Sequence, residues 1–144
     1  MTTIVIDERI ESVFYGLSNA YSLVHCMRLA GELSNDKSVE KFTRMLRIHQ
    51  GAMTKAYNYL ESIYDRRLND DDTVCYVELY NLGKDLTKIE LEFSNFTQSF
   101  PENDAEDTFL NKAQKSGVFG VMIILAECVA TFDELMVSLE LKAA

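Results

Sequence analysis

The chain has 144 residues, a formal net charge of −9 and 47% hydrophobic residues. This is enough for a single domain, residues 1–144, to bury a core without disulfides, metals or cofactors, and we expect none of these. One proline and six glycines leave few helix breakers, which favours an all-α class. The acidic charge disfavours direct binding to nucleic acid.

The first residues and the longest apolar run bear on the compartment. MTTIVIDERI carries acids at once and lacks the basic segment and apolar stretch of a secretory signal. The run from Val118 to Ala126 is far shorter than the ~20 residues that cross a bilayer. Cys26, Cys75 and Cys128 share no CxxC spacing and are predicted to be buried thiols in a reducing compartment. We therefore expect a cytoplasmic protein that does not bind a membrane.

Apolar residues at alternating spacings of four and three predict long helices, because this repeat keeps one stripe of a helix against a neighbour. The clearest stripe is Cys75, Leu79, Leu82, Leu86, Ile89, Phe93, Phe96 and Phe100. The expected helices cover residues 7–33, 37–68, 71–99 and 102–142. Short connections make neighbouring helices antiparallel, which predicts an up-down-up-down four-helix bundle.

The first two expected helices each carry a polar residue within the apolar stripe. In residues 7–33 this is Arg28, and because an unpaired buried guanidinium is costly, we expect it to bind an acid, with Glu127 as the predicted partner. In residues 37–68 it is His49, which we predict to be a core histidine.

The last two expected helices begin after acidic residues, which suit the positive end of a helix dipole. Residues 71–99 follow an Asp-rich turn, and Phe100 and Pro101 end that helix. The last helix, 102–142, is apolar on nearly every face from Val118 to Ala130, so we expect its most buried stretch there. A helix of this length would outrun its partners, which predicts a break near Ser116 and Gly117.

Charge is unevenly spread along the chain. Residues 34–68 carry four acids and seven bases, whereas residues 69–144 carry fifteen acids and five bases. On the second helix, a basic stripe faces away from the apolar stripe and has an aromatic residue beside it: Lys37, Lys41, Arg44, Lys55 and Arg66, with Tyr59. On the third, an acidic stripe repeats every seven residues: Asp71, Glu78, Asp85 and Glu92. Both stripes are candidate protein-binding surfaces; the simpler interpretation is two solvated faces.

The run from His25 to Arg28 resembles the start of the reactive helix of histidine phosphotransfer domains, which are acidic four-helix bundles. The resemblance implies that His25 accepts a phosphoryl group and that the Arg28 cation favours its binding. Leu29 stands where that family has a glycine, and the histidine lies on the first helix, earlier than expected.

Arg44 and His49 have an Arg-x4-His spacing that is similar to the ribonuclease signature of the helical HEPN domains. The resemblance implies ribonuclease chemistry at these two residues, although Met45 stands where that family usually has a polar residue. Di-iron bundles instead use Glu-x-x-His, and here Ser22 and Leu46 precede the two histidines by three residues, so no metal site is predicted.

No phosphate-binding glycine loop or nucleophile motif is present, and we predict no catalytic residues. The expected function is to bind another protein, as an adaptor, chaperone, inhibitor or self-associating regulator. Apolar surface left over on long helices favours a homodimer over a monomer. Three alternatives stay open: phosphotransfer, a ribonuclease, and an acidic nucleic-acid mimic that inhibits a nucleic-acid-binding protein.

Overall fold

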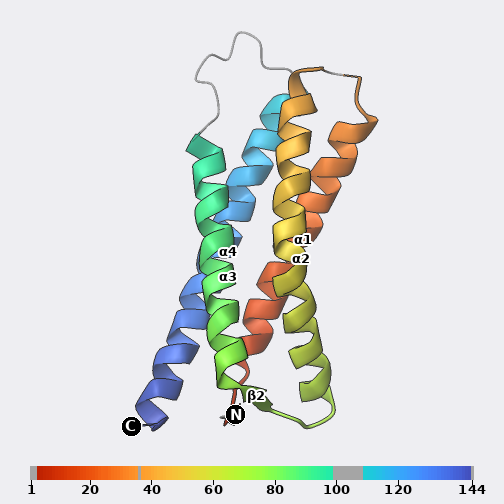
Figure 1. The fold of residues 1–144 in the computed structure, drawn as a ribbon. Helices are drawn as coiled ribbons and strands as arrows, with labels where there is room; N and C mark the ends of the chain where they lie inside the picture. Colours follow the sequence, from red (N-terminus) through yellow and green to blue (C-terminus); the bar gives the residue numbers. More distant parts are fainter. Residues whose placement is uncertain (1–2, 36, 99–108, 144) are drawn as a thin grey trace.

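The computed structural model describes residues 3–35, 37–98 and 109–143, and within them four long helices lie side by side (Figure 1). They are α1 (Arg9–Leu33), α2 (Glu40–Leu68), α3 (Tyr76–Gln98) and α4 (Phe109–Ala143). A 3-10 turn, η1 (Lys37–Val39), precedes α2, and two short strands are β1 (Thr3–Val5) and β2 (Thr73–Cys75). Successive helices run in opposite directions, which confirms the predicted up-down-up-down bundle.

The core is built from the predicted apolar stripes. Helix α1 packs against α2 and α4, and α3 packs against α4 and, less extensively, against α2. The α3 stripe is buried from Leu79 to Phe96, while Cys75 is half-buried and Phe100 lies outside the described residues, as does Pro101. Burying one Leu, Ile or Phe side chain contributes about 1.5–3 kcal/mol, so these stripes account for most of the stability of the bundle.

The two strands form a small antiparallel sheet in which Thr3 lies opposite Cys75 and Val5 opposite Thr73. Both strands contain β-branched residues, which favour extended backbone. Val74 is buried, and the chain continues from β1 into Ile6, which is also buried. This sheet was not predicted, and it delays the start of the third helix from residue 71 to Tyr76.

The Asp-rich turn ends α2 instead of beginning α3. The backbone N–H of Asp71 donates to the carbonyl of Arg66 and that of Asp70 donates to Arg67, both at 3.0 Å, while Asp70 has φ 63°. These bonds and this left-handed residue form a Schellman cap. The predicted start at residue 71 was wrong because its backbone closes the preceding helix. The other two starts shift by less, from 7 to 9 and from 37 to 40.

Helix α4 is continuous through Ser116 and Gly117, so the predicted break is wrong. Gly117 instead permits close packing, because a β-carbon there would collide with the sulfur of Met27 on α1. The stretch from residue 118 to 130 is also less buried than predicted, since α1 and α3 cover only one side of it. Its exposed apolar residues are Phe119, Ile123, Ala126 and Ala130. The predicted start of this helix at residue 102 lies outside the described residues.

Candidate functional site

The basic stripe begins at Lys37 in η1 and continues along the outer side of α2. Its exposed cations are Lys37, Lys41, Arg44 and Lys55. The exposed Ile48 sits among them, seven residues from Lys41 and from Lys55. Arg66 is half-buried and donates to the backbone carbonyl of Thr73 at 3.3 Å. Exposed charges of this kind contribute about 0–1 kcal/mol per pair, so the stripe adds little to folding.

Three residues of the acidic stripe face α2 across two grooves of 210 and 340 Å³ that share Lys55 and Asp85. The facing pairs, at 3.4, 3.9 and 3.8 Å, are Tyr59 with Glu78, Lys55 with Asp85, and His49 with Glu92. Asp71 lies apart, in the turn, where its carboxylate accepts hydrogen bonds from the backbone N–H and hydroxyl of Thr73, which lower the pKa of Asp71. The stripe therefore links α3 to α2, and its use in choosing a partner stays a prediction.

Tyr59, the predicted aromatic anchor, is half-buried in the smaller of these grooves beside Ala56 and Leu82. Burial and then the nearby Glu78 carboxylate raise the pKa of Tyr59 to about 12. Its hydroxyl therefore stays protonated and donates to Glu78 at 3.4 Å.

His49 is a core histidine, as predicted. Its ring lies 4.9 Å from the Phe93 ring and 5.2 Å from the Phe96 ring, measured between centroids, and it is 8% exposed. Neither ring nitrogen has a hydrogen-bond partner among the described residues. Burial lowers the pKa of His49, although Glu92 opposes this effect. Arg44 is exposed and lies five residues earlier, on a different side of the helix, so the ribonuclease alternative gains no support from this arrangement.

His25 is half-buried on α1 and sits between two hydrogen-bond donors. Its Nδ1 accepts from Arg28 at 3.3 Å and from the side-chain amide of Gln50 at 3.1 Å. Two donors at Nδ1 favour the neutral tautomer with the proton on Nε2. That tautomer leaves no lone pair on Nε2 to attack a phosphoryl group, so this geometry does not favour phosphotransfer, which stays an untested prediction.

The predicted pairing of Arg28 with Glu127 is wrong. Glu127 is exposed on α4, while the guanidinium of Arg28 extends along its own helix to within 4.0 Å of the Glu32 carboxylate. Arg47 of α2 binds the same carboxylate and lowers the pKa of Glu32. The prediction failed because an acid one turn away on the same helix can reach a half-buried arginine without entering the core.

Among the cysteines, Cys128 is buried, and burial raises the pKa of its thiol to about 11. Cys75 is half-buried and Cys26 is exposed. The prediction of three buried thiols is therefore confirmed for Cys128, met in part by Cys75 and wrong for Cys26, which falls on the outer side of α1, two residues beyond the buried Val24.

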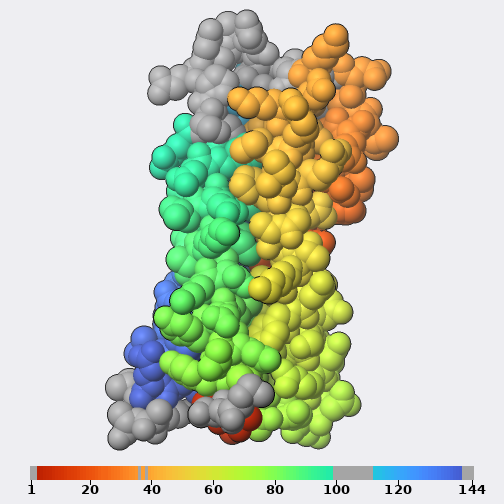
Figure 2. Space-filling model, viewed as in Figure 1, coloured from red at the N-terminus to blue at the C-terminus, as the bar shows by residue number. Residues whose placement is uncertain are grey.

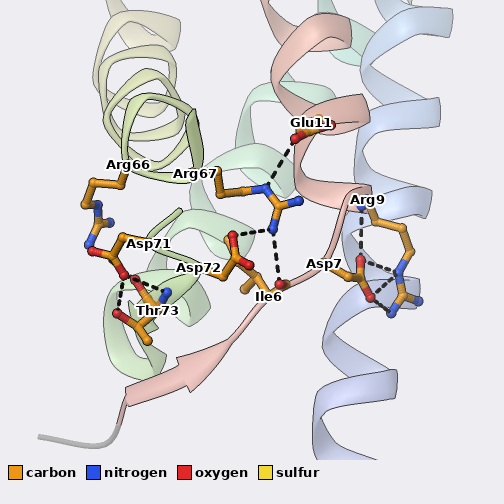
Figure 3. Close-up of polar contacts among 9 residues, drawn as sticks. All are labelled: Ile6, Asp7, Arg9, Glu11, Arg66, Arg67, Asp71, Asp72 and Thr73. Carbon is orange, nitrogen blue, oxygen red and sulfur yellow. Dashed lines mark hydrogen bonds and ion pairs between the residues drawn. The ribbon is translucent and has the colours of Figure 1, made fainter. Parts of the chain in front are cut away.

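Arg67, in the last turn of α2, joins several elements at the end of the bundle where the N-terminus lies (Figure 3). Its guanidinium donates to the carbonyl of Ile6 at 3.2 Å, to Asp72 at 2.9 Å and to Glu11 at 3.3 Å. The three acceptors belong to the segment after β1, the turn before β2, and α1. Arg67 is therefore a structural residue that closes this end of the bundle.

A wider groove lies on the other side of α3. It measures 680 Å³ and lies between α3 and α4, and Figure 2 shows the C-terminal part of α4, in blue, beside the N-terminal part of α3. The apolar residues that line it are Tyr80, Leu91, Phe132, Met136 and Val137, and the charged ones are Lys84, Lys88, Asp133 and Glu140. We call these nine residues the α3–α4 face.

The charges of the α3–α4 face are separated by helix. Lys84 and Lys88 belong to α3, and Asp133 and Glu140 belong to α4. No ion pair joins these lysines to these acids within the described chain, and the ammonium of Lys84 lies 4.8 Å from the centre of the Tyr80 ring. The groove therefore has a cationic rim and an anionic rim on either side of an apolar floor.

Sequence reasoning missed this face, although two further heptad patterns mark it. The exposed α3 stripe is Val77, Tyr80, Lys84, Thr87 and Leu91. The exposed α4 stripe is Ala126, Ala130, Asp133, Val137 and Glu140. The signal in the sequence was these second heptad stripes, because apolar residues that recur on a helix beside its core stripe indicate a further surface to be covered.

No protein family, curated protein or solved structure matches this chain. Within the described ranges, no three His, Cys, Asp or Glu residues are grouped to hold a metal ion. None of the described helices is both long enough and apolar enough to cross a membrane.

Proposed function

We propose that the protein works by binding, and that it holds a helix of another polypeptide chain in the groove of the α3–α4 face. One observation carries this proposal: both walls of a 680 Å³ groove expose large apolar side chains. Tyr80, Leu91 and Val137 are 48%, 58% and 55% exposed. Contiguous apolar surface of this kind is typical of an interaction site.

The chemistry of the groove defines what would fit it. An amphipathic helix lays its apolar side into such a groove, and the burial of apolar surface provides most of the affinity. The rims then set its orientation, because acids on the bound helix pair with Lys84 and Lys88 while bases pair with Asp133 and Glu140.

The two charged stripes support binding less well than this face. The α2 stripe contains one large apolar residue, Ile48, and exposed charges alone give little affinity. In the acidic stripe, Glu78, Asp85 and Glu92 already face partners on α2. Of these partners only Lys55 carries a charge, so only Asp85 is partly neutralised within the chain, while all three carboxylates are held against α2.

Two matched substitutions test the proposal. Tagged wild-type protein, Val137→Glu and Ile48→Glu are each incubated with a lysate of the source cells and with an untagged second copy of the chain. We expect the wild type and Ile48→Glu to retain the same polypeptide and Val137→Glu to lose it, with circular dichroism showing equal helix content. If only Ile48→Glu failed to retain the polypeptide, the binding site would lie on the basic stripe and the proposal would be wrong. Equal retention by all three proteins would also overturn the proposal.

A further inference from the structure

We infer that the polypeptide bound by the α3–α4 face is a second copy of this chain. In this arrangement, the α3–α4 faces of two copies pack together around a two-fold axis parallel to the helices, so that α4 of each copy lies against α3 of the other. The inference rests on the proposed function and adds the identity of the partner. It is carried by the match between the two walls of the groove.

The contact between α3 and α4 shows which residues of the two groove walls lie at the same height along the bundle. Gly83 lies so close to Phe132 that a β-carbon on it would be 2.7 Å from the phenylalanine ring. Since the helices are antiparallel, the following residues, Lys84 and Asp133, lie within about one turn of the same level, on opposite walls. A two-fold axis parallel to the helices exchanges the walls without moving them along the bundle. Lys84 of each copy therefore meets Asp133 of the other.

Beside the Lys84–Asp133 match, the exposed stripes match in size. Three residues before Asp133, Ala130 lies at the level of Thr87, which is three residues after Lys84. Seven residues before Asp133, Ala126 lies at the level of Leu91. In the other direction along the bundle, Val137, four residues after Asp133, lies at the level of Tyr80. Larger α3 residues thus oppose smaller α4 residues, and the heptad spacing of both stripes keeps them in contact over several turns.

The two exposed stripes are also of equal length, which suits an interface between two copies of one chain. Each stripe spans about 21 Å, and two helices about 10 Å wide over this length give about 420 Å² per copy, an area typical of weak, reversible association. A different protein would have to supply a helix with the same order of small, acidic and apolar residues. This chain supplies both halves itself.

Charge exchange between separate chains provides the test. Lys84→Glu makes both walls acidic at this level, and Asp133→Lys makes both walls basic. Each variant alone should self-associate roughly ten-fold more weakly than wild type, because every Lys84–Asp133 contact becomes repulsive. An equimolar mixture should recover the wild-type affinity, because each acidic wall then meets a basic one. Lys41→Glu, on the α2 stripe, is the matched control and should self-associate like wild type.

Sedimentation velocity over a range of concentrations measures these affinities, and circular dichroism confirms that the variants are folded. A wild type that stays monomeric, or a mixture that associates no better than its components, would overturn the inference. The proposed function would survive either result if, in the capture experiment, the wild type retained another protein and Val137→Glu did not. If that capture were also insensitive to Val137→Glu, both proposals would fail.

Discussion

At the scale of single residues, burial between Phe93 and Phe96 keeps His49 uncharged and makes the stability of the bundle depend on pH. The folded-state pKa lies below the ordinary value of about 6.5 because protonation would place a charge in the core. Below pH ~6.5 the unfolded chain therefore binds more protons than the folded one. The contribution of His49 to stability is complete above this pH and is lost progressively as the pH falls towards the folded-state pKa.

We therefore expect His49→Leu to flatten the dependence of the unfolding free energy on pH below about 6.5. Leucine cannot be protonated, and it removes two ring nitrogens that have no hydrogen-bond partner among the described residues. Urea unfolding of wild type and variant at a series of pH values measures the effect. Glu92→Gln is the companion variant and should steepen the dependence, because Glu92 opposes the lowering of the pKa. Equal slopes for wild type and His49→Leu would show that His49 does not cause the dependence.

Asp70 is the one described non-glycine residue with a positive φ, 63°, and it ends α2 in a conformation that glycine adopts without strain. Asp70→Gly should raise the unfolding free energy by about 0.5–1 kcal/mol. Asp70→Ala is its control and should lower it, because alanine tolerates this conformation less well than aspartate. Chemical denaturation measures both changes. A loss of stability with glycine would show that contacts of the carboxylate outweigh the backbone strain.

At the scale of elements, glycines let α1 approach its neighbours closely. A β-carbon on Gly31 would collide with the Thr43 side chain, which is buried and held by a hydrogen bond to the carbonyl of Val39 at 2.7 Å. Gly51, in the interior of α2, has nothing within 4 Å of the same position. The first glycine is required by packing and the second is not.

These two glycines therefore predict opposite effects of the same substitution. Gly31→Ala should lower the unfolding free energy by about 1–3 kcal/mol, because Thr43 cannot move without losing its hydrogen bond. Gly51→Ala should raise it by about 1 kcal/mol, because alanine favours helix and meets no neighbour. Thermal unfolding followed by circular dichroism compares them. Stabilisation by both substitutions would contradict the close packing of α1 on α2.

The elements that sequence predicted well are those set by repetition. The stripe from Leu79 to Phe96 repeats the spacings of three and four over about two and a half heptads, so its period identifies both the helix and its buried side. The strands Thr3–Val5 and Thr73–Cys75 have three residues each, too few to show a period, and they form only because distant segments meet. The Schellman cap was missed for a related reason, since Asp70 stands where a glycine would have signalled it.

At the scale of the whole molecule, the surfaces were harder to predict than the core. A stripe of charges such as Lys41, Arg44 and Lys55 is visible in the sequence, but its electrostatic environment depends on the acids that α3 places opposite. The α3–α4 face depends on which side of α4 remains uncovered, and that follows from the packing of three helices. Sequence alone therefore identified the core, and it also assigned to the core the stretch of α4 from 118 to 130, which is partly exposed.

The central claim is that the α3–α4 face binds a polypeptide, and site-specific photo-cross-linking in intact source cells tests it most directly. A photoreactive phenylalanine analogue replaces Val137 in one variant and Ile48, at the exposed centre of the basic stripe, in another. We predict that irradiation attaches a polypeptide, either a second copy or another protein, to the probe at position 137 and not to the probe at position 48. Cross-links at position 48 alone, or at neither position, would contradict the account.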